Sequence, residues 1–244
     1  MSNIVLLHGA WHGGWSWGNL QALLEQHGHR VFTPTFTGLG DRAHLLTPQV
    51  GIHTHIQDIV AFFQYQELDE CVLIGHSYAG LIMPGLQEQL HITGSTHIQR
   101  AVYLDAVLVP GGQSWAYSHP PATRRQRLAS SYQGSNDTTV FPVPTVANMG
   151  VNDPAHIRWA DSLLTPHPTR SYTDIQNVDP DLYPGIYVDC TQPALSALES
   201  SKLYARQLGW PYLELQAGHD CMISHPLETL HILEPYLSCA PPIV

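Results

Sequence analysis

Six short apolar runs, separated by longer amphipathic stretches, constrain the fold of this chain more than any other feature. The runs are predicted strands at residues 4–8, 30–33, 71–74, 99–104, 185–190 and 212–215. Most are apolar on both faces, as expected for a parallel sheet that helices cover on both sides. The stretches between them repeat apolar residues at helical spacing, as Ile52, Ile56, Ile59 and Phe63 do. The alternation predicts an α/β fold with a six-stranded, mostly parallel, doubly wound sheet.

One long segment interrupts this alternation. Residues 106–184 hold ten of the 19 prolines, two tryptophans, and several tyrosines and arginines. A structureless loop of that length is uncommon in a compact domain. We therefore predict an inserted cap at 106–184, and a core formed by 1–105 and 185–244, in a single domain overall.

Charge and composition exclude several classes of function. The net charge is −10, and only 12% of residues are charged. Such a chain lacks the cationic surface expected for binding nucleic acid or an anionic membrane. No apolar run reaches the roughly 18 residues of a membrane span, and the start of the chain does not resemble a signal peptide. The four cysteines (Cys71, Cys190, Cys221 and Cys239) are far apart, which predicts buried thiols in a cytoplasmic protein. The sequence does not decide the oligomeric state, and a homodimer is one of the alternatives.

The strongest chemical signal is the sequence VLIGHSYAG at 72–80. An apolar strand leads into Ser77, and small residues then open a helix. In that context a serine occupies a sharp turn with its hydroxyl exposed above the sheet. The usual G-x-S-x-G spacing is altered, since Ala79 takes the place of the second glycine and Gly80 follows it. The alternative is an ordinary serine in a strand–turn–helix connection.

A second signal, HGAWHGGW at 8–15, follows the first strand. Acyl transfer places negative charge on a carbonyl oxygen, which prearranged N–H groups can stabilise. We assign this oxyanion hole to the backbone N–H groups of Ala10 and Tyr78. His8 and His12 are expected to shape the loop by hydrogen bonding.

A third signal, AGHD at 217–220, follows the last strand. A serine hydroxyl needs a base near neutral pH, which a histidine can supply. His219 lies after a strand end and C-terminal to the serine, in the order Ser…acid…His of this architecture. The remaining histidines show no ligand spacing, so no metal or cofactor is expected.

The chain resembles the α/β-hydrolase fold, and in particular the small esterases related to plant methylesterases and hydroxynitrile lyases, with their bacterial relatives. The stretches that carry the resemblance are LLHGAWHGGWSW (6–17), TGLGDRAHLL (37–46), VLIGHSYAG (72–80), VYLDA (102–106), LTPHP (164–168) and AGHDCMISHP (217–226). It implies a six-stranded core, a cap over the serine and a Ser-His-acid mechanism without a cofactor.

The sequence departs from that group at three positions. The lyases of this group are similar in that they carry a threonine and a lysine at two positions of the site. This chain has Gly9 and Asp220 at those positions, and the difference favours an esterase. Pro193 stands where the esterases carry an aspartate in a C-T-x-D segment. The triad acid must therefore come from elsewhere or be absent.

We predict that Asp105 is the acid. It follows the strand at 99–104, so it is expected at the same edge of the sheet as Ser77. This position of the acid is similar to that in some haloalkane dehalogenases, which share the fold and carry the triad acid at the end of the same strand. Its rivals are Asp189, expected within a strand, and Glu199, expected on a helix. The alternative role for Asp105 is to cap a turn or anchor the cap.

These residues predict a serine esterase that cleaves small neutral carboxylic esters, with carbamates or activated amides as further substrates. Ser77 would form the acyl-enzyme and His219 would transfer protons. The predicted pocket is aromatic, and its residues are Trp11, Trp115, Tyr117, Tyr132 and Trp159. Two alternatives stay open, a carbon–carbon lyase resembling the hydroxynitrile lyases and a ligand-binding protein on a hydrolase scaffold.

Overall fold

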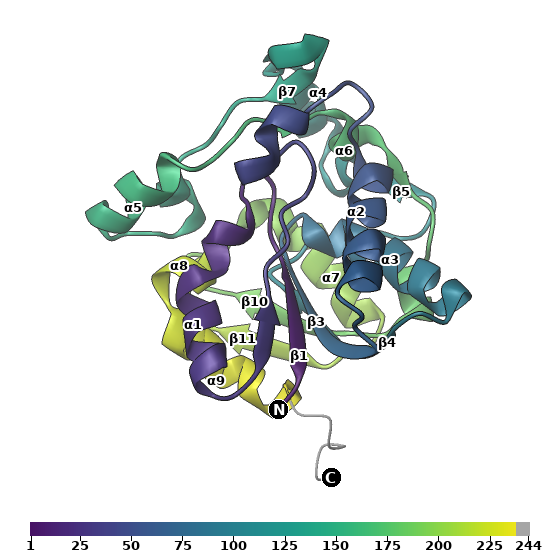
Figure 1. Cartoon of the computed structure of the whole chain (residues 1–244). Helices are drawn as coiled ribbons and strands as arrows, with labels where there is room; N and C mark the ends of the chain where they lie inside the picture. Colours follow the sequence, from purple (N-terminus) through teal and green to yellow (C-terminus); the bar gives the residue numbers. More distant parts are fainter. Residues whose placement is uncertain (238–244) are drawn as a thin grey trace.

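A parallel sheet of six strands forms the centre of the molecule in the computed structural model, which describes residues 1–237 (Figure 1). In chain order the strands are β1 (Asn3–Leu7), β2 (Arg30–Phe32), β3 (Glu70–His76), β4 (His97–Leu104), β10 (Ile186–Cys190) and β11 (Tyr212–Leu215). Their order across the sheet is β11-β10-β4-β3-β1-β2. Every pairing is parallel, so the six predicted strands are confirmed and the sheet is wholly rather than mostly parallel.

Helices cover both faces of this sheet, as Figure 1 shows. The helices of one layer are α2 (Ile52–Tyr65), α3 (Ala79–Thr93) and α7 (Glu199–Gln207), and those of the other are α1 (Gly18–Gln26), α8 (Cys221–Ser224) and α9 (Pro226–Leu233). Successive side chains of a strand point to opposite faces. Accordingly Val5 and Leu7 belong to the apolar cluster of the first layer, whereas Ile4 and Leu6 belong to that of the second. This two-sided burial explains why the strands are continuous apolar runs.

The segment between β4 and β10 folds into short elements beyond the carboxyl ends of the strands (Figure 1). Its helices are α4 (Pro121–Ala129), α5 (Pro154–Asp161) and α6 (Arg170–Thr173), and its strands are β5 (Gln113–Ser114), β6 (Tyr132–Gln133), β7 (Thr139–Phe141), β8 (His167–Pro168) and β9 (Ile175–Gln176). These strands pair antiparallel in two small sheets of their own. The segment therefore adds no strand to the central sheet.

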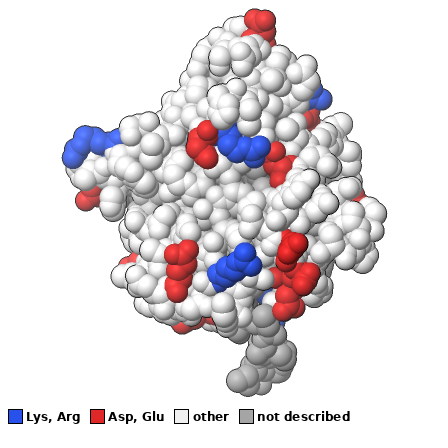
Figure 2. Space-filling model, viewed as in Figure 1, with Lys and Arg blue, Asp and Glu red and all other residues white. Residues whose placement is uncertain are grey.

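The surface and the cysteines can be compared with the sequence expectations. On the face shown in Figure 2, charged side chains are few and both signs are interspersed on a largely uncharged surface. No helix within residues 1–237 is long and apolar enough to cross a membrane. Cys71, Cys190 and Cys221 are buried and free, as predicted. Cys239 lies outside the described residues.

Gly80 allows α3 to pack against the chain that leaves β4. A Cβ atom at this position would lie 2.4 Å from the carbonyl oxygen of Val107 and 2.8 Å from Cβ of Ala106. At Gly18, the first residue of α1, a Cβ would meet nothing within 4 Å. The displaced second glycine of the serine motif is thus required by packing.

We expect Gly80→Ala to lower the free energy of unfolding by about 1–3 kcal/mol, because a backbone carbonyl cannot move aside cheaply. Gly18→Ala is the matched control and should be neutral or slightly stabilising, since alanine is the better helix former. Urea unfolding followed by circular dichroism measures both. Equal stability of the two variants would contradict the close approach of α3 to Val107.

Candidate active site

Ser77 occupies a sharp turn between β3 and α3. Its φ of +52° lies in the left-handed region, which is unusual for a residue other than glycine. Asp105 at the end of β4 and Trp11 after β1 share this property, with φ of +41° and +66°. Backbone strain of this kind persists where the surrounding structure enforces it, and it is frequent at functional sites. Three strained residues thus lie at the carboxyl ends of three neighbouring strands.

The side chains of Ser77, His219 and Asp105 form a hydrogen-bonded chain. Nε2 of His219 lies 2.9 Å from Oγ of Ser77, and Nδ1 of His219 lies 2.6 Å from Oδ2 of Asp105. All three residues are buried, with 8%, 4% and 0% of their surface exposed in the order Ser77, His219 and Asp105. This is the geometry of a nucleophile, a base and an orienting carboxylate.

The rivals of Asp105 lie elsewhere. Asp189 is part of β10, where its carboxylate accepts a hydrogen bond from the Tyr212 hydroxyl at 2.7 Å. Glu199 begins α7 and is exposed. Neither is hydrogen-bonded to His219. Asp105 is therefore the carboxylate that the fold brings to the histidine, as expected from its position after the strand beside the one that carries Ser77.

His8 holds the loop after β1 through both nitrogens of its ring. The carbonyl of Gly9 accepts a hydrogen bond from Nδ1 of His8 at 2.8 Å, while Nε2 of His8 accepts one from the amide of Phe36. Since the C=O and N–H of a trans peptide point in opposite directions, His8 fixes the direction of the Ala10 N–H. Burial lowers the pKa of His8 to about 3, so the ring is neutral at pH 7, as this pattern requires.

Ala10 and Tyr78, the predicted oxyanion residues, are both buried, and within residues 1–237 neither amide donates a hydrogen bond. The loop can approach the serine because a Cβ at Gly9 would lie 2.9 Å from Nδ1 of His76 and 3.0 Å from Cβ of Ser77. A threonine at this position would therefore clash with the serine turn.

Asp220 and His12 form further hydrogen bonds that hold the same loop. His12 donates from Nδ1 to the carbonyl of Ala10 at 2.8 Å and from Nε2 to Asp220 at 3.2 Å. Burial alone would lower the pKa of His12, but the charge and hydrogen bond of Asp220 raise it, so the two form a buried ion pair. His76 donates to the carbonyl of His219 at 2.9 Å. His76, His219 and Asp220 are close enough together to hold a metal. However, both ring nitrogens of His219 are hydrogen-bonded, to Asp105 and to Ser77, so His219 has no nitrogen free to bind a metal.

A pocket of about 200 Å³ opens over Ser77 and His219. Its walls include Trp11 and Trp115, as predicted, together with Met149, Leu198 and Arg127. Three other predicted pocket residues lie outside it, and all are substantially exposed: Tyr117, Tyr132 and Trp159. Trp159 packs its ring against Trp15, with centroids 5.3 Å apart. The aromatic content of the inserted segment did not show which rings face the serine, and the sequence reasoning did not assign Arg127, Met149 or Leu198 to the pocket.

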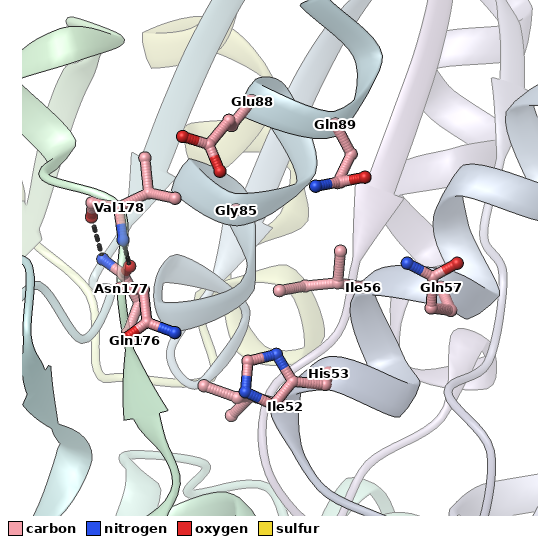
Figure 3. A pocket seen from close by; sticks show the side chains of 10 residues that line it. All are labelled: Ile52, His53, Ile56, Gln57, Gly85, Glu88, Gln89, Gln176, Asn177 and Val178. Carbon is pink, nitrogen blue, oxygen red and sulfur yellow. Dashed lines mark hydrogen bonds between the residues drawn. The ribbon is translucent and has the colours of Figure 1, made fainter. Parts of the chain in front are cut away.

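A second hollow lies away from the serine, between α2, α3 and the chain after β9 (Figure 3). Its lining contains Gln57, Gln89 and Asn177, with apolar residues between them. Figure 3 shows no serine or cysteine among the side chains that line it. This second hollow therefore has no serine to pair with its histidine, unlike the first pocket.

Comparison with known proteins agrees with this geometry. The sequence profile described as "Alpha/beta hydrolase family" matches residues 4–231. The chain belongs to the α/β-hydrolase family. A relative named carbendazim hydrolyzing esterase, from Nocardioides sp. (strain SG-4G), is 32% identical over 242 residues, which cover 93% of this chain and 96% of the relative. Salicylic acid-binding protein 2 of Nicotiana tabacum is 32% identical over 80 residues, 32% of this chain and 31% of its own length.

The α/β-hydrolase fold is also shared with solved structures. An extracellular α/β-hydrolase from a Paenibacillus species aligns with a TM-score of 0.81 at 20% identity, over 98% of this chain and 99% of that one. A pyrethroid hydrolase from Sphingobium faniae JZ-2 aligns with a TM-score of 0.73 at 20% identity, over 97% of both chains. At this level of identity the likeness establishes the fold alone.

Within this α/β-hydrolase fold, Lys202 from α7 contacts the carboxylate that pairs with His219. Its Nζ lies 3.2 Å from Oδ1 of Asp105, contacts Oδ1 of Asp189, and donates to the carbonyl of Cys190. Only 3% of Lys202 is exposed. Burial alone would raise the pKa of Asp105, but the hydrogen bond and charge of His219, and then the charge of Lys202, lower it. Lys202 therefore helps to keep the Asp105 carboxylate ionised.

We expect Lys202→Met to lower the free energy of unfolding at pH 7 by about 3–5 kcal/mol, because two buried carboxylates lose their cation. Arg206→Met is the matched control, since Arg206 reaches Asp189 from the surface at 3.7 Å with 46% of its side chain exposed. Loss of that exposed pair should cost less than about 1 kcal/mol.

The pH dependence of this loss has a definite sign. The pKa of Asp105 is depressed in the folded state. Its contribution to stability is therefore present above its unfolded value of about 3.9 and disappears as the pH falls through the folded value. The difference between wild type and Lys202→Met should shrink below about pH 4. Urea unfolding across pH measures this, and a pH-independent difference would contradict the electrostatic origin.

Proposed function

We propose that this protein hydrolyses carboxylic esters through an acyl-enzyme formed on Ser77. The observation that carries the proposal is the chain of hydrogen bonds from Ser77 through His219 to Asp105, with distances of 2.9 Å and 2.6 Å. The names of the relatives support it, because one is called an esterase and several plant relatives are called methylesterases.

Each group has a defined part in the reaction. Oγ of Ser77 attacks the ester carbonyl while Nε2 of His219 takes the hydroxyl proton, which then passes to the departing alcohol. Asp105 holds the ring so that Nε2 faces the serine, and it stabilises the imidazolium. The N–H groups of Ala10 and Tyr78 would bind the oxyanion. Water, activated by His219, then releases the acid from Ser77.

The substrate range follows from the pocket. Its volume of about 200 Å³ limits the substrate to a small molecule. Carbamates and activated amides present the same electrophilic carbonyl to the serine, so they form the second class of substrates to be tested. The competing functions have less support. Asp220, at the position of the lyase lysine, is fully buried and paired with His12. A hydrogen-bonded Ser-His-Asp chain is also more than a binding protein requires.

Ser77→Ala should reduce ester hydrolysis to the background rate while leaving the fold intact, because the hydroxyl is the nucleophile. Hydrolysis of p-nitrophenyl and methyl esters by the purified protein measures this. Ser135→Ala, at an exposed position, is the control. A serine-reactive phosphonate should label Ser77. Labelling of another serine, or full activity of Ser77→Ala, would refute the acyl-enzyme.

Asp105→Asn should lower kcat by a factor on the order of 10⁴, because an amide stabilises the wrong tautomer of His219. Asp189→Asn is the comparison, since Asp189 does not touch the histidine, and its effect on kcat should be far smaller. Steady-state kinetics on one methyl ester decide the point. If Asp189→Asn showed the larger loss, Asp105 would not be the triad acid.

A further inference from the structure

The pocket over Ser77 contains a cation that lacks a partner. Arg127, from α4, lines this pocket together with Ser77 and His219. Three other arginines, Arg42, Arg170 and Arg206, form ion pairs with aspartates. Within residues 1–237 the guanidinium of Arg127 forms no hydrogen bond and no ion pair. An arginine presents five N–H donors, and partial burial without partners is unfavourable.

Two aromatic rings hold this guanidinium in place. Cζ of Arg127 lies 5.5 Å from the ring centre of Trp115 and 5.9 Å from that of Tyr172. Trp115 itself lines the pocket, and its ring lies 5.8 Å from that of Tyr78, the residue after the serine. Contact with ring faces leaves the donors in the guanidinium plane free. Arg127 is thus positioned beside the pocket without its hydrogen-bonding capacity being used.

The surroundings of Arg127 provide no negative charge. No aspartate or glutamate lines the pocket. His119 also lines the pocket. It is neutral at pH 7, because burial and the charge of Arg127 lower its pKa to about 4. Burial also lowers the pKa of Arg127, which shows that the charged form is penalised there. Arginine nevertheless stays protonated in proteins. The guanidinium of Arg127 could therefore form an ion pair with an anion that enters the pocket.

We propose that the esters hydrolysed here carry an anionic group, a carboxylate in the simplest case, remote from the scissile bond, and that Arg127 binds this group while Ser77 attacks the ester. This inference rests on the proposed function and makes it more specific. A guanidinium binds a carboxylate through two parallel hydrogen bonds, and the apolar walls suit the hydrocarbon between the two polar ends. The preferred substrates would then be anionic, whereas the sequence predicted neutral esters.

The test compares charged and neutral esters of matched length. The first series contains monomethyl esters of straight-chain dicarboxylic acids from succinate to sebacate, each paired with the methyl ester of the monocarboxylic acid. A second pair, 4-acetoxybenzoate and phenyl acetate, places the carboxylate on the alcohol side. We expect wild type to favour the charged member of at least one pair, and Arg127→Met to reduce that ratio of kcat/KM values about tenfold or more. Arg127→Lys should restore part of it.

Controls separate charge recognition from packing. Arg125→Met removes an exposed cation from the same helix and should leave every ratio as in wild type. A measurement on wild type alone covers the case in which Arg127→Met does not fold. In the wild-type protein, the preference for the charged ester should weaken as the ionic strength rises. Ester hydrolysis with no preference for the charged member, or a ratio that Arg127→Met does not alter, would overturn the inference alone. If wild type hydrolyses no ester at all, the proposed function fails and the inference falls with it.

Discussion

The two oxygens of the buried Asp105 carboxylate have different partners, and the rest of the site depends on this division. Oδ2 accepts from His219, while Oδ1 accepts from the amide of Cys190 and lies beside Lys202. A carboxylate without such partners would be unstable in the interior. The fold supplies them from three elements at the carboxyl edge of one parallel sheet. The position of the histidine, and through it that of the serine hydroxyl, follows from how this one charge is stabilised.

The charges near Ser77 and that of Arg127, which line the same pocket, are balanced differently. Beside Ser77 the charges are paired or neutralised, since Lys202 lies against carboxylates and His8 and His76 are held neutral by burial. No aspartate or glutamate within residues 1–237 forms an ion pair with Arg127, and none lines the pocket. The chain as a whole carries a net charge of −10, so long-range attraction does not favour anions. Selection for an anionic substrate would have to arise from short-range contacts inside the pocket.

Much of the site could be predicted because its residues follow predicted strands. The carboxyl ends of parallel strands share one edge of the sheet, so Ser77, Asp105 and His219 were expected together once their strands were recognised. The pocket could not be predicted in the same way. Its walls come mainly from a segment of short elements without periodic patterning, so nothing in the sequence distinguished Trp115, which faces the serine, from Trp159, which does not. Lys202 also gave no signal, because a lysine in an amphipathic helix is usually exposed.

Lys202 is the only lysine in the chain, and it is almost completely enclosed. No ε-amino group is therefore offered to reagents that couple to surface lysines, and attachment chemistry of that kind leaves the site untouched. The same fact makes the protein simple to observe by spectroscopy. Isotope-labelled lysine introduces a single side-chain ammonium signal, and its chemical shift reports the charge balance beside Asp105 without interference from any other lysine.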